Sequence, residues 1–179
     1  MQNLEFAVLD FIQNNMANDF WDFIMPKITA LGNAGILWII LTLVFLISKK
    51  YRPVGLVMLI ALIIDLILCN IILKPAVARI RPYDINTAFK LLIPAQPDYS
   101  FPSGHSAASF AAVTAMYLTG CRFWKPAAVI AFAIAFSRLY LYVHFPTDVI
   151  AGILLGILSG IAGYKIYKKY SDSNSRKTV

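Results

Sequence analysis

Long apolar runs are the feature that most limits what this chain can fold into. No charged side chain occurs between Ile28 and Ser48, and about 20 mostly apolar residues are enough for a helix to cross a bilayer. Hydrophobic residues make up 59% of the 179 residues and charged residues only 14%, whereas soluble domains carry about 25% charged residues. We therefore predict an all-α integral membrane protein.

Five stretches are apolar and long enough to be transmembrane helices. They are residues 31–48, 54–73, 103–121, 126–143 and 146–166. We predict that these spans pack as one bundle, which forms a single transmembrane domain over residues 31–168. The second span carries Asp65 at its middle. Intramembrane carboxyl groups are often functional, but a neutral, hydrogen-bonded acid is the simpler interpretation here.

Residues 1–30 are too polar to form a conventional span. Their apolar side chains follow a helical pattern, which predicts an amphipathic helix lying in the membrane interface. The pattern consists of Leu4, Val8, Leu9, Phe11 and Ile12. Residues 18–30 leave two alternatives open, a shallow re-entrant segment or a sixth membrane helix.

Lysine and arginine residues predict the orientation of the chain in the membrane. Ten of the sixteen follow the first, third and fifth spans, and basic loops stay on the cytoplasmic side. They are Lys49, Lys50, Arg52, Arg122, Lys125, Lys165, Lys168, Lys169, Arg176 and Lys177. Residues 169–179 are thus a predicted cytoplasmic tail, and residues 74–102 and 138–148 face the other side. This distribution also explains the net charge of +7, so we expect no nucleic-acid partner.

Small residues predict which helices pack closely. The third span begins SGHSAASFAAVTA, and the fifth carries Gly152, Gly156 and Gly160 at four-residue spacing. Small side chains let membrane helices approach each other. We interpret the glycine series as helix packing within the chain.

Three polar segments are predicted to meet at the non-cytoplasmic face. They are KPAVARIRP at 74–82, PSGH at 102–105 and SRLYLYVHFPTD at 137–148. Lys74, Arg81 and Arg138 supply cations suited to phosphate oxygens. Ser103 is a natural helix N-cap, and the free amides after it, including that of Gly104, form an anion site.

The only two histidines of the chain lie in these segments, at His105 and His144. Asp148 follows His144 by four residues, a spacing that lets the carboxylate orient the imidazole. This set indicates phosphoryl transfer, in which one histidine attacks and the other protonates the leaving oxygen. Without a cluster of carboxylates, a two-metal mechanism is not expected.

Taken together, the three segments resemble the three-part signature of the type 2 phosphatidic acid phosphatase family. Lys74 to Pro82, Pro102 to His105 and Ser137 to Asp148 match it in order and spacing. The resemblance implies that His144 is the nucleophile that forms a phosphohistidine. Asp148 would orient it, and His105 would be the general acid.

The same resemblance implies a phosphate-binding set and no metal or cofactor. The phosphate-binding residues would be Lys74, Arg81, Ser103, Gly104 and Arg138. We expect supporting positions behind them at Asn70, Pro82, Pro102 and Ser137. Arg79 borders the cationic cluster as either a supporting or a merely interfacial residue, and Asp98 is expected in a solvated loop.

The short outward loop over residues 74–102 leaves the site open to a lipid in the membrane. Small members of the family resemble bacterial undecaprenyl-diphosphate phosphatases, so our first expectation is that substrate, in a bacterial cytoplasmic membrane with the site facing outward. The alternatives are phosphatidylglycerophosphate, then phosphatidate or lipid A 1-phosphate. A small transporter would also use Asp65 and Arg138, but it would not explain both histidines. The sequence predicts no oligomeric state.

Overall fold

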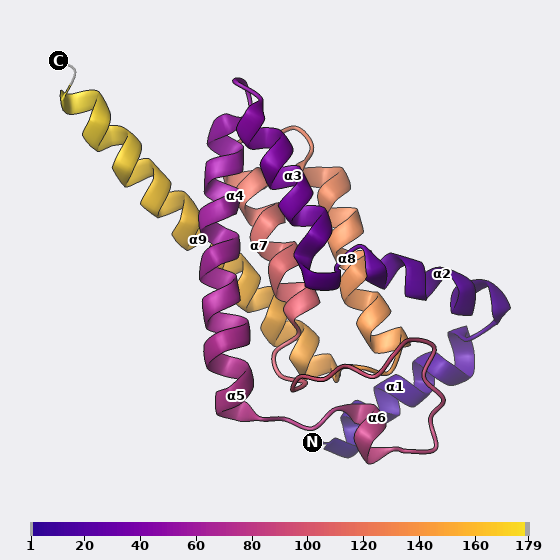
Figure 1. Cartoon of the computed structure of the whole chain (residues 1–179). Helices are drawn as coiled ribbons and strands as arrows, with labels where there is room; N and C mark the ends of the chain where they lie inside the picture. The colour runs from indigo at the N-terminus through magenta and orange to yellow at the C-terminus, as the bar shows by residue number, and fades with distance from the viewer. Residues whose placement is uncertain (1, 178–179) are drawn as a thin grey trace.

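The computed structural model describes residues 2–177 of the chain, and the side chains of residues 2–173. Every regular element within them is helical (Figure 1). The elements are α1 (Gln2–Met16), α2 (Asp19–Ala30), the 3-10 turn η1 (Asn33–Gly35), α3 (Ile36–Ile47), α4 (Arg52–Asp65), the π-helix η2 (Leu66–Leu73), α5 (Lys74–Val77), α6 (Pro82–Ile85), α7 (Gly104–Leu118), α8 (Trp124–Tyr140) and α9 (Pro146–Lys177). The predicted all-helical class is confirmed.

The long helices stand side by side as a bundle (Figure 1). By length and composition, the helical stretches Arg52–Ile85 and Pro146–Ser173 are able to cross a membrane. The pair Asp19–Ala30 and Asn33–Ile47, bent by 45°, makes a third span if it is counted as one. A membrane bundle is therefore confirmed, whereas the predicted count of five spans is not. Helix α9 continues past residue 168 without a break in secondary structure.

The predicted start of the first span, at residue 31, is wrong. Helix α3 begins only at Ile36, and the chain before it makes a turn between α2 and α3. Ala34 and Gly35 adopt positive φ angles of 49° and 68°, which an α-helix does not contain. Glycine and asparagine in this stretch favour such a turn, and residues 18–30 form the separate helix α2.

Helix α7 is the central helix of the bundle, and nine of its fifteen residues are buried. The glycines of α9 allow it to pack directly on α7. A Cβ atom at Gly152 would lie 2.5 Å from the carbonyl oxygen of Ser103, and one at Gly156 would lie 2.3 Å from that of Ala107. These contacts confirm that the glycine series serves packing.

We expect Gly156→Val to destabilise the fold, because its side chain would overlap the α7 backbone. Overpacking a tight interior costs about 1–3 kcal/mol or more. Leu154→Val, on the exposed face of the same helix at 57% exposure, is the matched control. The thermal midpoint in detergent should fall for the first variant and stay near the wild-type value for the second. Equal midpoints would show that the close contact contributes nothing.

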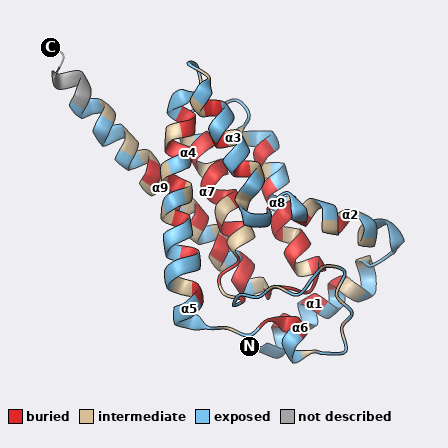
Figure 2. Cartoon of the chain, in the orientation of Figure 1, coloured by how far each residue is buried: buried red, intermediate tan, exposed pale blue. Residues whose placement is uncertain are grey.

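The buried residues lie inside the bundle, and the outward faces of its helices are exposed (Figure 2). Many of the exposed side chains are large and apolar, as expected of lipid-facing helices. Ile47, Val129 and Leu158 are 81%, 70% and 63% exposed. Helix α1 is amphipathic as predicted, but its apolar residues divide between two environments. Leu9 and Ile12 are buried against the segment that joins α8 to α9, while Leu4 and Phe11 are exposed.

The two ends of the bundle differ in character. The α3–α4 turn and the α7–α8 loop lie at one end, and they carry basic residues such as Lys49 and Arg122 (Figure 1). Helices α5 and α6, the loop before α7 and the α8–α9 junction lie at the other end (Figure 1). The three polar segments picked out by sequence thus meet at one end, opposite the basic turns.

Candidate active site

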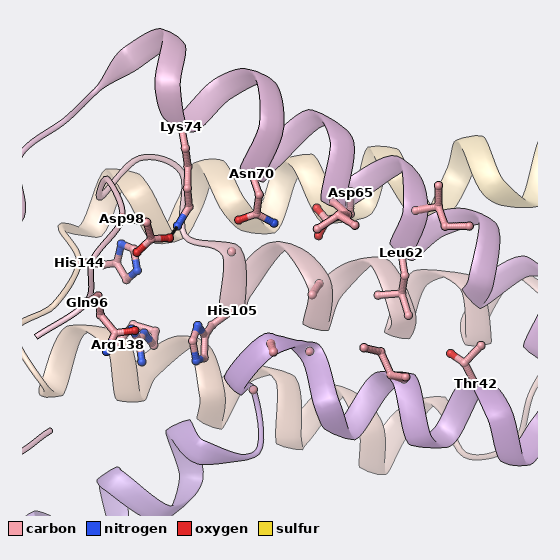
Figure 3. A pocket seen from close by; sticks show the side chains of 18 of the residues that line it. Thr42, Leu62, Asp65, Asn70, Lys74, Gln96, Asp98, His105, Arg138 and His144 are labelled. Carbon is pink, nitrogen blue, oxygen red and sulfur yellow. Dashed lines mark hydrogen bonds and ion pairs between the residues drawn. The ribbon is translucent and has the colours of Figure 1, made fainter. Parts of the chain in front are cut away.

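A cavity of about 770 Å³ opens at this second end and extends between α3 and α4 (Figure 3). The part of the cavity between α3 and α4 is apolar and is lined by Ile39, Leu43, Leu59, Leu62 and Ile63. Six of the predicted site residues line it, namely Lys74, Arg81, Gly104, His105, Arg138 and His144. The other two, Ser103 and Asp148, are buried directly behind this wall.

The π-helix η2 brings the second span into the cavity. Asn70 lies within it and Lys74 directly follows it, and both line the cavity (Figure 3). Short π-helical segments within α-helices are frequently found at functional sites. A Cβ atom added at Gly104 would lie only 3.2 Å from Asn70 Oδ1, so a larger residue there would require the Asn70 side chain to shift by a few tenths of an ångström.

Arg81 is fixed in the cavity wall by several acceptors. Its Nη1 atom donates to the carbonyl oxygen of Val143 at 2.7 Å and lies 3.2 Å from His144 Nε2. Only 3% of the Arg81 side chain is exposed. The guanidinium group therefore lies beside Nε2 of His144, whereas the other ring nitrogen, Nδ1, faces Asp148.

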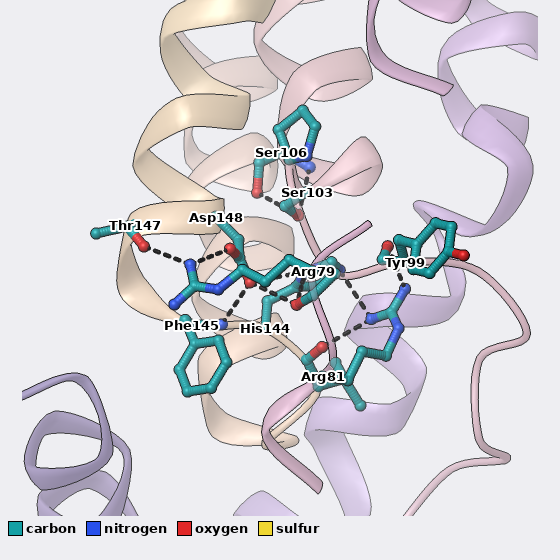
Figure 4. Close-up of polar contacts among 12 residues, drawn as sticks. Arg79, Arg81, Tyr99, Ser103, Ser106, His144, Phe145, Thr147 and Asp148 are labelled. Atoms are coloured by element: carbon teal, nitrogen blue, oxygen red, sulfur yellow. Dashed lines mark hydrogen bonds and ion pairs between the residues drawn. The ribbon is translucent and has the colours of Figure 1, made fainter. Parts of the chain in front are cut away.

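His144 and Asp148 approach each other as their spacing predicts. His144 Nδ1 lies 3.6 Å from Asp148 Oδ2 (Figure 4), and the hydroxyl of Ser100 is close to both atoms. Ser100 Oγ donates to Asp148 Oδ2 at 2.5 Å and lies 3.4 Å from His144 Nδ1. Ser100 had no sequence signal, because a single serine in a loop belongs to no pattern.

Arg79 contacts Asp148 from the outer side (Figure 4). Its Nη1 atom donates to Asp148 Oδ1 at 2.6 Å and to Thr147 Oγ1 at 2.7 Å. Its Nη2 atom pairs with the buried carboxylate of Glu5, from α1. Of the two alternatives left open by the sequence, Arg79 is therefore a supporting residue, and the N-terminal helix reaches the site through it.

His105 contacts the bend before α3, and Arg138 contacts the last turn of α2. His105 Nε2 lies 3.0 Å from the amide oxygen of Asn33, which belongs to that bend. Arg138 Nη1 donates to Thr29 Oγ1 at 2.6 Å. Its Nε atom is buried and has no hydrogen-bond partner among the described residues. A buried donor of this kind is costly unless a ligand accepts from it.

Asp98 lies in an exposed loop, as the sequence indicated, but its carboxylate also takes part in the cationic cluster. Its carboxylate pairs with Lys74 and, at 2.6 Å, with Arg81 Nη2. Burial alone would raise the pKa of Asp98, but the hydrogen bonds and charges of Lys74 and Arg81 outweigh it and lower the pKa to about 2. A loop prediction cannot detect this pairing, because it depends on where residues 86–103 cross the cavity.

The charges around His144 favour its neutral form. Burial, followed by the positive charges of Arg81, Arg138 and Lys74, lowers the pKa of His144 well below its usual range. A neutral imidazole has a free nitrogen lone pair, which a nucleophile requires. The cationic surroundings therefore keep His144 in the reactive form near neutral pH.

The residues expected to support the site differ in what they contact. Ser137 donates to the carbonyl oxygen of Ile134 in its own helix, so its contact is local. Pro82 begins α6 and is buried. The carbonyl oxygen of Pro102 lies 3.9 Å from Cys69 Sγ. Asp65 lines the cavity beside its apolar part, and its Oδ1 atom has no hydrogen-bond partner among the described residues.

Ser103 is the N-cap of α7, as predicted, since its hydroxyl accepts from the amide of Ser106. The helix N-terminus that it caps points into the cavity wall beside Lys74. An all-helical membrane bundle with three cations, a helix N-terminus and a histidine–aspartate pair at one cavity is suited to binding and transferring a phosphoryl group.

Comparison with known proteins agrees with this description. The sequence pattern of the PAP2 superfamily matches residues 51–172, and the chain belongs to that superfamily. It is 38% identical over 120 residues to a protein of Sulfolobus acidocaldarius named undecaprenyl-diphosphatase. That match covers 66% of this chain and 58% of the relative, so the chain spans little more than half the length of that protein.

Other relatives carry different substrate names. Phosphatidylglycerophosphatase B of Bacillus subtilis is 35% identical over 148 residues, which cover 75% of this chain and 70% of that protein. Among solved structures, Aquifex aeolicus LpxE is similar with a TM-score of 0.79 at 29% identity, over 90% of this chain and 95% of LpxE. A PAP2-type phosphatidylglycerolphosphate phosphatase from Bacillus subtilis is similar with a TM-score of 0.73 at 26% identity, over 96% and 86% of the two chains.

Proposed function

We propose that this chain is a membrane lipid phosphatase that removes the terminal phosphate of a lipid phosphate or diphosphate. The observation that carries the proposal is the cavity itself. One part of it is lined by Lys74, Arg81 and Arg138, which are buried. The part between α3 and α4 is apolar, and its side chains Ile39 and Leu43 are 47% and 54% exposed. One continuous space therefore suits a molecule with an anionic head and a hydrocarbon tail.

The chemistry that we propose begins with attack by His144 Nε2 on phosphorus. The bond from phosphorus to the leaving oxygen breaks as the bond to nitrogen forms, and His105 donates a proton to that oxygen. Lys74, Arg81 and Arg138 neutralise the charge on the non-bridging oxygens. Ser103 and Gly104, at the start of α7, would add backbone amides.

Water then hydrolyses the phosphohistidine, with His105 now accepting the proton of the attacking water. Asp148 holds the His144 ring through Nδ1 and stabilises the positive charge that develops on it. Asp148 is itself fixed by Arg79, by Ser100 and by the amide of Phe145 at 2.8 Å. This support leaves the carboxylate little freedom to turn away.

Undecaprenyl diphosphate is the substrate that we propose first. The Sulfolobus acidocaldarius relative that bears this substrate's name is 38% identical over the matched residues. In addition, the apolar part of the cavity between α3 and α4 suits a hydrocarbon chain. Phosphatidylglycerophosphate is the second candidate, supported by the Bacillus subtilis relative and by the similar Bacillus subtilis structure. Phosphatidate and lipid A phosphates are the remaining candidates, ranked after these two.

A substrate panel tests the proposal and ranks the candidates. Purified protein in detergent is given undecaprenyl diphosphate, phosphatidylglycerophosphate and phosphatidate, and kcat/KM is measured for each by phosphate release. The first substrate should give the highest value, and vanadate should inhibit release. A higher value for phosphatidylglycerophosphate would replace the first candidate by the second. No release from any lipid would favour the transporter alternative.

We propose that the site faces the outside of a bacterial cytoplasmic membrane. The support is that the site lies at the end of the bundle opposite the basic turns, which by the positive-inside rule stay in the cytoplasm. On the same basis we propose that residues 1–30 form the interfacial segment, residues 31–168 the transmembrane phosphatase domain and residues 169–179 the cytoplasmic tail. Residues 1 and 178–179 lie outside the described residues.

We expect full activity in the presence of a metal chelator. The proposed mechanism uses Lys74, Arg81 and Arg138 for the charge neutralisation that a metal ion performs in other phosphatases. Phosphate release measured in EDTA should equal release in the same buffer with Mg²⁺. A strict requirement for Mg²⁺ would contradict the mechanism.

A further inference from the structure

Asp98 occupies a position that the substrate's phosphate needs. Its carboxylate contacts Lys74 through Oδ2 (Figure 3) and Arg81 through Oδ1. Arg81 Nε also donates to the carbonyl oxygen of Asp98 at 2.9 Å. These are two of the three cations proposed to bind the phosphate, and carboxylate and phosphate oxygens accept from the same donors.

The partners in this contact differ in how firmly the fold holds them. The side chains of Lys74 and Arg81 are only 7% and 3% exposed, whereas that of Asp98 is 46% exposed. Asp98 also lies in the loop that joins α6 to α7 and belongs to no helix. The cations are therefore fixed parts of the cavity, and the carboxylate enters from its open side.

We propose that Asp98 is a specificity-determining residue, whose carboxylate holds the phosphate site in the free protein and is displaced when the substrate's phosphate binds. The proposal rests on the proposed phosphatase function. Because the pKa of Asp98 is held at about 2, its carboxylate stays charged, and so keeps competing, at every pH at which such an enzyme is assayed.

This competition would act differently on different phosphate groups. A terminal phosphate carries close to two negative charges near neutral pH and offers several oxygens to Lys74 and Arg81. A phosphodiester carries one negative charge, so it gains less from the same cations. Asp98 would therefore favour terminal phosphates and diphosphates over the far more abundant phosphodiester lipids of the membrane.

The opposing interpretation is that Asp98 only positions the two cations. The two roles predict opposite effects of removing the charge. If Asp98 competes, Asp98→Asn binds anions more tightly. If Asp98 positions Lys74 and Arg81, the same variant loses turnover and binds anions no better.

The test compares wild type, Asp98→Asn and Asp84→Asn, where Asp84 is an exposed carboxylate on the neighbouring helix α6. The measured quantities are the inhibition constants of inorganic phosphate and vanadate, and KM and kcat for the best lipid of the panel. Charge-assisted pairs of this kind lead us to expect inhibition constants about tenfold lower in Asp98→Asn. Its KM should fall as well, and Asp84→Asn should match the wild type.

An unchanged or higher inhibition constant in Asp98→Asn, accompanied by a lower kcat, would overturn the proposal. Asp98→Ser serves as a second variant, since it also removes the charge, and it must show the same tightening. Failure of the wild-type protein to release phosphate would instead contradict the proposed phosphatase function. The two failures are therefore distinguishable in one set of measurements.

Discussion

His144→Ala should release no lipid phosphate above background, a loss of about 10⁴-fold or more, as expected when a nucleophile is removed. The physical reason is that no other side chain at the cavity can take its place. Of the two histidines of the chain, His105 contacts Asn33 instead of Asp148. Phosphate release under saturating lipid, with a long incubation, measures the loss.

The fold of this variant should survive, because Asp148 keeps its bonds to Arg79, Ser100 and the Phe145 amide. The buried Asp148 carboxylate is therefore not left without a partner. Inorganic phosphate should still raise the thermal midpoint, since Lys74 and Arg81 remain, and added imidazole should restore part of the activity. Retention of most wild-type activity would refute the nucleophile assignment.

His105→Asn should slow the reaction by about 10²–10⁴-fold, the usual contribution of a general acid. The size of the effect should depend on the leaving group. An alkyl lipid phosphate needs a proton on its leaving oxygen, whereas an aryl phosphate leaves readily without one. We therefore expect a large loss with phosphatidate and a much smaller loss with an aryl phosphate, both measured as kcat.

The comparison of the two substrates in one variant is its own control. A variant that had lost its fold would lose both activities to the same degree. Equal losses in a protein with an unchanged thermal midpoint would mean that His105 does not protonate the leaving group. Its contact with Asn33 at 3.0 Å would then point to a structural role.

The side chains that converge on the cavity could be predicted because they stand at helix ends. Once the apolar spans and the basic turns are placed, Lys74, His105 and His144 must fall on the same side of the membrane. The glycine series of α9 was equally readable, since four-residue spacing marks one helix face. Both predictions depend only on the spacing of residues along a helix and on the order of the spans, and the amino-acid sequence contains both.

Most of the residues that escaped prediction lie where the chain is irregular, and Glu5, which lies in α1, is the exception. Asn33 lies in a bend whose backbone includes Ala34 at a positive φ, which alanine seldom adopts. Asp98 and Ser100 lie in the loop between α6 and α7, whose path depends on tertiary contacts. Glu5 is paired with a residue seventy-four positions away, Arg79, and nothing local marks that contact.

The central claim is that the phosphoryl group passes through His144. The most direct test gives labelled lipid phosphate to the purified protein and stops the reaction at high pH, where phosphohistidine survives, before locating the label by peptide mass spectrometry. We predict labelled phosphate on the peptide containing His144 in the wild type and none in His144→Ala. Active wild-type protein with no label on His144, or with label on another residue, would contradict the account.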